Sequence, residues 1–202
     1  MSNYKFVLAT AKILRVLYES SAINSQGQFC NGWQYRCRNL VDELAYFTTT
    51  QNGILFVCHF REAKQFCKFS ERAWLLSQDM PEETYLRQQK GPVHGEHIVP
   101  ISLVQKIAFD MLEIGMTDRQ LADMLTHLVE VVFITKDEQK FLDFSAKKGG
   151  LGLKTSMPDG WDFDVHDHDW SKARRYSRLE AADIKIASQT KENSLNMNDL
   201  SG

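Results

Sequence analysis

The sequence lacks three features that identify a class of protein at once. Its 24 Lys and Arg against 26 Asp and Glu give a formal charge of −2, which excludes a protein that coats nucleic acid through bulk positive charge. No stretch approaches the roughly 20 apolar residues that cross a bilayer, and the first residues lack the charged and apolar segments of a secretory signal. We therefore expect a cytoplasmic protein with no membrane partner.

Cysteine is scarce, and its spacing does not match a common metal site. Cys30, Cys37, Cys58 and Cys67 are the four cysteines, and their separations fit none of the close pairs of zinc-binding proteins. In a reducing compartment we expect free and mostly buried thiols. A zinc site made from these four residues is the alternative.

The chain has enough apolar material for a core. Of its 202 residues, 43% are hydrophobic and 11% are aromatic, which excludes wholesale disorder. The length suits one domain, or one domain with appendages. Three regions follow from the composition along the chain, namely a helical region at 1–90, a mixed region at 91–187 and a disordered tail at 188–202.

The periodicity of apolar residues predicts an α+β fold that is predominantly helical. In the first region we expect helices at 5–20 and 39–47, a short one that Ser70 caps, and another that opens at Pro81. Residues 54–57 fit a buried strand or a buried helix, and we favour a helix. A loop rich in Ser, Asn, Gln and Gly separates the first two helices.

The second region alternates strands and helices. An irregular strand is expected at 93–99, and a helix at 102–114 ends at Gly115. Thr117 and Gln120 have the spacing of a capping box and predict a helix that runs to Leu128. β-Branched residues predict a strand at 129–135, Thr135 caps a helix from 136 to about 145, and a last helix is expected at 172–186.

Glu96 and His97 are the residues with the clearest chemical meaning. Hydrolysis of a phosphodiester at neutral pH needs a base that activates water and a cation that stabilises the phosphate. A neutral imidazole can be that base, and a carboxylate is a ligand that magnesium prefers. Neighbouring residues of a strand point to opposite faces, so the two can share a site only where the strand bends or twists.

In this pattern the chain resembles the HNH, or ββα-metal, family of nucleases over roughly residues 91–145. The matching pieces are the acid and histidine before Pro100, the strand at 131–135 and the helix that follows it. The resemblance implies a small two-stranded ββα motif embedded among helices, with His97 as general base and Glu96 as metal ligand. It also implies Mg²⁺ or Mn²⁺ as the favoured cofactor, with Zn²⁺ as an alternative, and DNA as the favoured substrate.

The motif departs from the family pattern at two positions. The last histidine of the family falls near Gln139, whose carbonyl oxygen is a weaker ligand than an imidazole. The central asparagine falls near Glu130, and no asparagine lies between His97 and Gln139. The residues that could replace the missing groups as metal ligands or supporting residues are His94, His127, Glu130 and Asp137.

A basic stripe follows the motif. Arg174, Arg175 and Arg178 share one face of the expected last helix, and arginine binds phosphate through two hydrogen bonds. We expect these residues to contact nucleic acid. Ion pairing with the acidic residues at 162–169 is the alternative.

These observations lead to a metal-dependent endonuclease as the first hypothesis for function. The second hypothesis is a protein that binds nucleic acid or another protein on a degenerate HNH-like scaffold, without catalysis. The third is a helical binding module in which Glu96 and His97 are adjacent by chance. A protein partner or assembly into a homo-oligomer is compatible with each of them.

Overall fold

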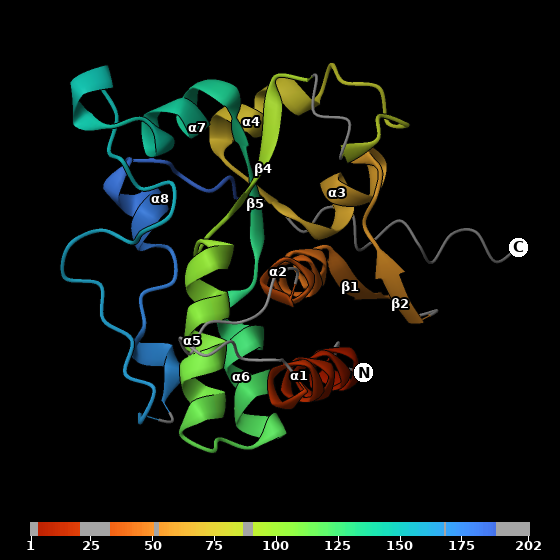
Figure 1. Ribbon diagram of the computed structural model, residues 1–202. Helices are drawn as coiled ribbons and strands as arrows, with labels where there is room; N and C mark the ends of the chain where they lie inside the picture. The colour runs from red at the N-terminus through yellow and green to blue at the C-terminus, as the bar shows by residue number, and fades with distance from the viewer. Residues whose placement is uncertain (1–3, 21–32, 51–52, 87–90, 168, 189–202) are drawn as a thin grey trace, which may run out of the picture.

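The computed structural model describes residues 4–20, 33–50, 53–86, 91–167 and 169–188. Within these residues the fold is α+β and predominantly helical, as the sequence predicts (Figure 1). The loop expected between the first two helices lies largely outside the described residues, and so does the tail beyond residue 188. The helices are α1 (Tyr4–Glu19), α2 (Trp33–Leu44), α3 (Phe60–Phe66), α4 (Glu71–Ser77), α5 (Ile101–Glu113), α6 (Asp118–Leu128), α7 (Lys136–Asp143) and α8 (Ser177–Ala181).

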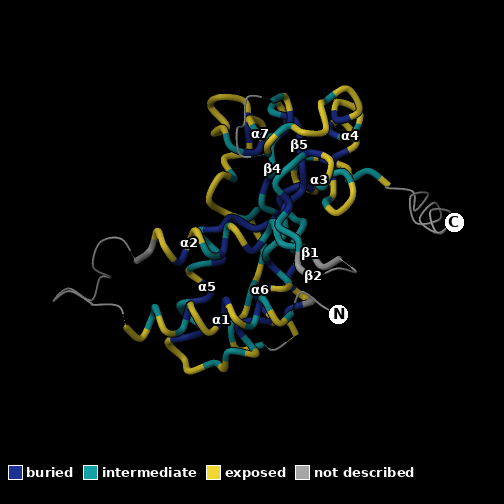
Figure 2. Tube along the Cα trace, turned by 90° about the vertical axis from the view of Figure 1, so that its right-hand side faces the viewer, coloured by how far each residue is buried: buried dark blue, intermediate teal, exposed yellow. Residues whose placement is uncertain are grey.

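Four of the helices form the larger of two hydrophobic cores. α1 packs against α6, and α2 packs against α5, so that their buried sides face one another (Figure 2). Leu14 of α1 and Leu125 of α6 belong to this core and are at most 1% exposed. The helices of the region 1–90 and those inserted in the region 91–187 therefore share one core.

A three-stranded sheet lies beside this helical core and carries the motif. Its order is β3 (Lys68–Phe69), β5 (Val131–Thr135) and β4 (Val93–His97). β4 and β5 are antiparallel, with Glu96 opposite Val132 and His97 opposite Val131. Every residue of β5 is buried, because the central strand of a sheet is covered on both faces. β4, β5 and α7 thus form a ββα unit into which α5 and α6 are inserted.

Four capping predictions are confirmed. Thr117 accepts a hydrogen bond from the backbone of Gln120 and begins α6. Thr135 does the same for α7 through the backbone of Glu138, so β5 continues into the helix without a linker. Ser70 begins α4. Gly115 ends the helix before it with φ +81, a conformation that glycine adopts without steric cost.

Three predictions of secondary structure are wrong. The segment 53–56 is not helical but is β2 (Gly53–Phe56), paired with β1 (Phe47–Thr50) in a hairpin; a short apolar run fits either structure until its partner is known. Residues 81–86 form turns and a single bridge between Tyr85 and His59 instead of a helix. The expected last helix is reduced to α8, preceded by a 3₁₀ turn, η3 (Trp170–Lys172).

A second, smaller core lies on the other side of the sheet from most of the helices. Phe60, Phe69 and Phe133 form its centre, with ring centroids 5.0–6.0 Å apart. It joins α3 and α4 to the strands. Among the described residues, no helix combines the length and the apolar character needed to cross a bilayer.

The packing of α1 on α6 generates a prediction about stability. Leu125→Ala removes a fully buried side chain from the larger core and is expected to lower the free energy of unfolding by about 2–5 kcal/mol. The matched control is Leu75→Ala, since Leu75 is 69% exposed. Urea unfolding of both variants measures the difference, and similar values for the two would contradict this packing.

Candidate functional site

Strand β4 presents its functional side chains on two opposite faces. Its pairing with β5 is regular from Val93 to His97, so successive side chains alternate between the faces. His94 and Glu96 lie on the face next to α7 and α8, whereas Gly95 and His97 lie on the face next to α2. Glu96 and His97 are adjacent in sequence but do not share a site.

On the first face, Glu96 is bound to a fully buried arginine. The Glu96 Oε1 atom lies 2.8 Å from Nη1 of Arg178 in α8. The same Nη1 donates to the carbonyl oxygen of His97 at 2.6 Å. Arg178 has no exposed surface, so its charge depends on Glu96 for compensation. The C-terminal segment is in this way attached to the end of β4.

The charges around Glu96 determine its ionisation. Burial acts to raise the pKa of Glu96, but a hydrogen bond with His94 and the positive charge of Arg178 outweigh burial and lower the pKa. The pKa of Asp143, at the end of α7, shifts in the opposite direction. Burial and the negative charge of Glu96 raise the pKa of Asp143. Of these two carboxyl groups, Glu96 is therefore the one whose ionised form its surroundings favour.

A polar chain connects Glu96 to Gln139, the two predicted metal ligands. The His94 Nε2 atom lies 3.4 Å from Oε2 of Glu96, and His94 Nδ1 lies 3.4 Å from Nζ of Lys136. The same Nζ lies 3.4 Å from Oε1 of Gln139. Because Nδ1 of His94 faces an ammonium group, Nδ1 accepts and Nε2 donates to Glu96.

These residues do not fit the magnesium or manganese ion that the resemblance implies. The oxygen atoms of Glu96 and Gln139 face Arg178 and Lys136, so the positions of a cation are taken by two positively charged side chains. Among the described residues, Glu96 belongs to no group of three His, Cys, Asp or Glu ligand atoms within 4.8 Å of one another. Glu96 and Gln139 are thus parts of a salt-bridged structural cluster.

On the second face, His97 forms a close pair with Asp42 of α2. The His97 Nε2 atom lies 2.7 Å from Oδ1 of Asp42. In the neutral imidazole, the carboxylate accepts the Nε2 proton and fixes the ring, and Nδ1 is then the unprotonated nitrogen. His97 Nδ1 is enclosed and has no hydrogen-bond partner among the described residues. A carboxylate on one nitrogen and a bare second nitrogen is the arrangement of a general base.

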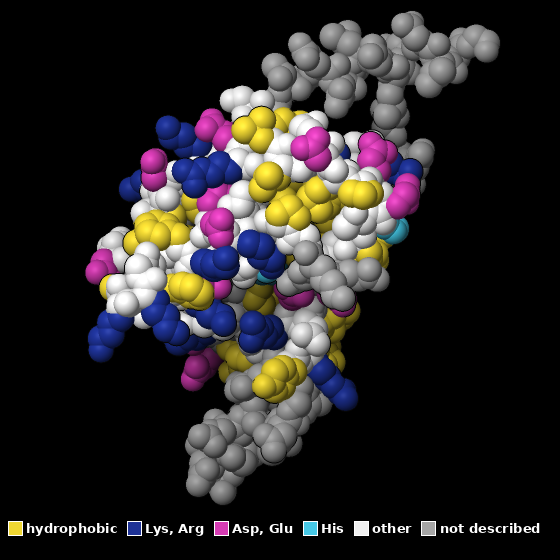
Figure 3. Space-filling model, turned by 90° about the horizontal axis from the view of Figure 1, so that it is seen from above, with side chains coloured by type: hydrophobic (Ala, Val, Ile, Leu, Met, Phe, Trp, Pro, Cys, Tyr) yellow, Lys and Arg dark blue, Asp and Glu magenta, His cyan; other side chains and the backbone are white. Residues whose placement is uncertain are grey.

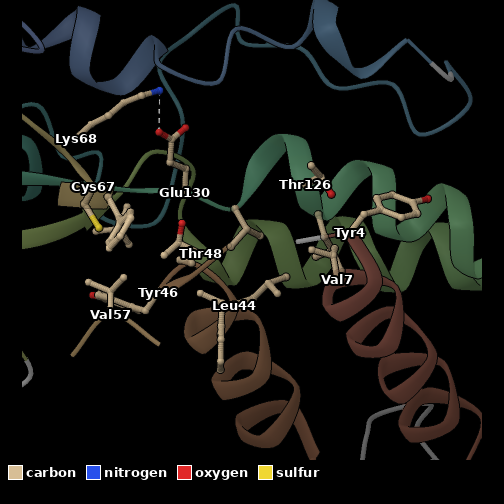
Figure 4. Close-up of a pocket in the computed structure, with 16 residues that line it drawn as sticks. Tyr4, Val7, Leu44, Tyr46, Thr48, Val57, Cys67, Lys68, Thr126 and Glu130 are labelled. Carbon is tan, nitrogen blue, oxygen red and sulfur yellow. Dashed lines mark ion pairs between the residues drawn. The ribbon is translucent and has the colours of Figure 1, made fainter. Parts of the chain in front are cut away.

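Tyr46 connects this pair to a cavity. Its ring meets His97 edge-on, with centroids 6.3 Å apart. A side chain on Gly95 would place Cβ 2.9 Å from the Tyr46 hydroxyl, so glycine in the motif permits this approach. Tyr46 also lines a cavity of about 220 Å³ between α1, α2 and the strands (Figure 4). Tyr46 therefore contacts both the His97 ring and the cavity.

Glu130, the predicted replacement for asparagine, lies at the edge of this cavity in an ion-pair network. Glu130 Oε1 lies 2.9 Å from Nζ of Lys68, and Oε2 accepts from the Tyr176 hydroxyl at 2.6 Å. Arg175 Nη2 lies 3.3 Å from Oε2. Burial, together with the charge of Glu130, raises the pKa of the Cys67 thiol in the same wall to about 12. Glu130 thus joins β3 to the C-terminal segment.

The expected basic stripe does not exist as a helical face. Arg174 and Arg175 precede α8, and only Arg178 lies within it. Arg178 is buried and Arg175 donates to the carbonyl oxygen of His127 at 3.0 Å, so neither presents a free guanidinium. Arg174 is exposed and pairs with Glu180 at 2.5 Å. The prediction fails because the helix is too short to align the three residues.

The remaining predicted residues have local roles. The His127 Nε2 atom lies 3.1 Å from the carbonyl oxygen of Ala173, which anchors the C-terminal segment to α6. Asp137 is 88% exposed and pairs with Lys140 within α7. These contacts of His127 and Asp137 involve neither Glu96 nor His97.

Exposed positively charged side chains follow α7 in the chain. Figure 3 views the molecule from above and shows Lys and Arg side chains interspersed with Asp, Glu and hydrophobic side chains. The chain that follows α7 carries the exposed side chains of Lys147, Lys148 and Lys154. Lysine at such positions attracts phosphate groups locally although the net charge of the chain is negative.

Sequence reasoning missed two residues of the site, Asp42 and Arg178 in its buried role. Asp42 lies 55 positions before His97 and has no spacing that links it to the motif. For Arg178 the sequence holds a signal, because the nearby Leu179 and Ile184 are apolar. Both of these residues are buried in the structure. Comparison of the chain with protein families, with curated proteins and with solved structures finds no match.

The pair of Arg178 and Glu96 generates a prediction about stability. Arg178→Met leaves the Glu96 carboxylate buried without its cation, which is expected to cost about 3–5 kcal/mol in urea unfolding at pH 7. Adding Glu96→Gln to that variant is expected to recover part of the loss, since no charge then remains buried. Arg174→Met is the matched control on an exposed pair and should change little. A loss no larger than that of the control would contradict the assigned role.

Proposed function

We propose that this protein is an HNH-like nuclease that hydrolyses phosphodiester bonds of nucleic acid in the cytoplasm, with His97 as general base. The pairing of His97 with Asp42 at the end of the first strand of a ββα unit carries the proposal. The resemblance to the HNH family implies a general base on this first strand of the ββα unit. Asp42 adds the partner that a catalytic imidazole needs, and no part of the resemblance led to it.

The chemistry assigned to the pair is a proton transfer. The Nδ1 atom of His97 takes a proton from a water molecule, and the hydroxide attacks phosphorus while the bond to the leaving oxygen breaks. Asp42 holds Nε2–H and stabilises the imidazolium that forms. The imidazolium then returns its proton to the leaving oxygen. The step requires a water molecule to reach Nδ1, which the surrounding side chains enclose in this structure.

The proposal needs a surface that attracts nucleic acid. Lys147, Lys148 and Lys154 supply exposed positive charge after α7, in place of the arginines that the sequence favoured. DNA is the substrate we favour. We assign no step to a metal ion at Glu96 and Gln139, because Arg178 and Lys136 already compensate these oxygens.

A second candidate is binding of nucleic acid without catalysis on the same scaffold. Two observations favour it, namely the enclosure of His97 Nδ1 and the salt-bridged state of Glu96. A protein of this kind retains the lysines and the ββα unit but does not cleave. The two candidates differ in one measurable property, which is turnover.

The experiment is a nicking assay on supercoiled plasmid with magnesium, with manganese and with a chelator. Wild type is expected to nick the plasmid. His97→Ala is expected to nick about 10²–10⁴-fold more slowly, because this factor is the usual contribution of a general base. Asp42→Asn should lose less, since it keeps the ring in place but removes the charge. Glu96→Gln that folds should retain most of the activity.

The control is His166→Ala, which removes an exposed histidine outside the site. Equal nicking by His97→Ala and by this control would contradict the catalytic role. If wild type retards labelled DNA in a gel but nicks under none of the three conditions, binding without catalysis is the function. If Glu96→Gln folds but no longer nicks the plasmid, Glu96 belongs to the active site.

A further inference from the structure

We propose that Cys58, His59 and Glu62 bind one zinc ion, at a site separate from the proposed nuclease centre. The three residues lie at the start of α3, far along the chain from both Asp42 and His97. In the described part of the chain they are the group whose His, Cys or carboxylate ligand atoms all lie within 4.8 Å of one another.

The distances fit the edges of a zinc tetrahedron. Cys58 Sγ lies 3.2 Å from His59 Nδ1, and His59 Nδ1 lies 3.6 Å from Oε1 of Glu62. With zinc bonds of about 2.3 Å to sulfur and about 2.0–2.2 Å to nitrogen and oxygen, tetrahedral ligands are roughly 3.3–3.6 Å apart. An ion can therefore enter with small movements of the three side chains.

The backbone holds the ligands in this arrangement before any ion binds. Glu62 Oε2 accepts hydrogen bonds from the backbone N–H groups of Cys58 at 3.0 Å and of His59 at 2.7 Å. These bonds direct the other oxygen, Oε1, toward the imidazole, and they neutralise the N–H groups that would repel a cation. Preorganisation of this kind reduces the entropy that binding must overcome.

The segment 82–86 supports the same turn from outside. Three backbone hydrogen bonds join the two segments. The N–H groups of Phe60 and Arg61 donate to the carbonyl oxygens of Thr84 and Glu82, and the N–H group of Leu86 donates to the carbonyl oxygen of Cys58. The Tyr85 ring meets the His59 ring at 5.7 Å. His59 and Glu62 retain 33% and 16% exposure of their side chains, so the site is fixed in place and still reached from solvent.

The set of ligands selects zinc over magnesium. A thiolate and an imidazole are soft or intermediate donors, which zinc accepts and magnesium does not prefer. Three protein ligands leave the fourth position of the tetrahedron open, as in zinc sites that bind water or a substrate. Binding replaces the thiol proton of Cys58, which is released to solvent.

This site differs from the zinc alternative that the sequence offers. That alternative uses four cysteines, of which Cys37 and Cys67 lie elsewhere in the described fold. Here one cysteine combines with a histidine and a glutamate within five positions. The spacing is not that of a common zinc motif, and only the turn before α3 brings the three ligand atoms together.

The test is a titration of the full chain with cobalt, which replaces zinc and absorbs light when a thiolate binds it. One equivalent per chain is expected to produce sulfur-to-cobalt charge-transfer absorption, and zinc is expected to abolish it. Cys58→Ser should lose this absorption. His59→Gln and Glu62→Gln should keep sulfur as a ligand but bind at least about tenfold more weakly, as for loss of a metal-supporting group.

The matched control is Cys67→Ser, which removes a thiol outside the cluster and should titrate as wild type. Circular dichroism verifies that each variant is folded, and the two glutamine variants decide the matter if Cys58→Ser is not. Wild type without charge-transfer absorption overturns the proposal, and so does absorption that survives in Cys58→Ser or disappears in Cys67→Ser. None of these readouts depends on nuclease activity.

Discussion

The buried guanidinium of Arg178 is the constraint on which the arrangement of the site depends. A fully buried positive charge is tolerated only with a partner and hydrogen-bond acceptors, and Arg178 finds both at the end of β4, in Glu96 and in the carbonyl oxygen of His97. This contact attaches the C-terminal segment to the ββα unit. It also withdraws Glu96 from the chemistry that its position beside a histidine indicates.

The two faces of strand β4 therefore have different roles. The face toward α7 is a closed network of charges, in which His94, Lys136 and Gln139 extend the contact of Glu96. The face toward α2 holds His97, which has a carboxylate on one nitrogen and, within the described part of the chain, no partner on the other. His97 is therefore the candidate reactive residue and Glu96 stabilises the fold, although the two are consecutive in the chain.

Local signals in the sequence were sufficient for the elements around the site. The capping residues Thr117 and Thr135 and the terminating Gly115 act within one helical turn, so their effects can be read from neighbouring positions. The segment 53–56 was misassigned because its partner strand decides its structure. Asp42 could not be found, since contact with His97 spans 55 positions and arises from packing of α2. Local sequence was enough for the correct predictions, whereas the wrong or missing ones depend on strand pairing and helix packing between residues that are far apart in the chain.

The central claim is that Asp42 prepares His97 as a base, and the tautomer of His97 tests it most directly. Nitrogen NMR of the ¹⁵N-labelled chain near neutral pH distinguishes a protonated ring nitrogen from a bare one. We predict a proton on Nε2, directed at Asp42, with Nδ1 bare, and we expect Asp42→Asn to weaken this preference. A proton on Nδ1 of wild-type His97 at that pH would contradict the account.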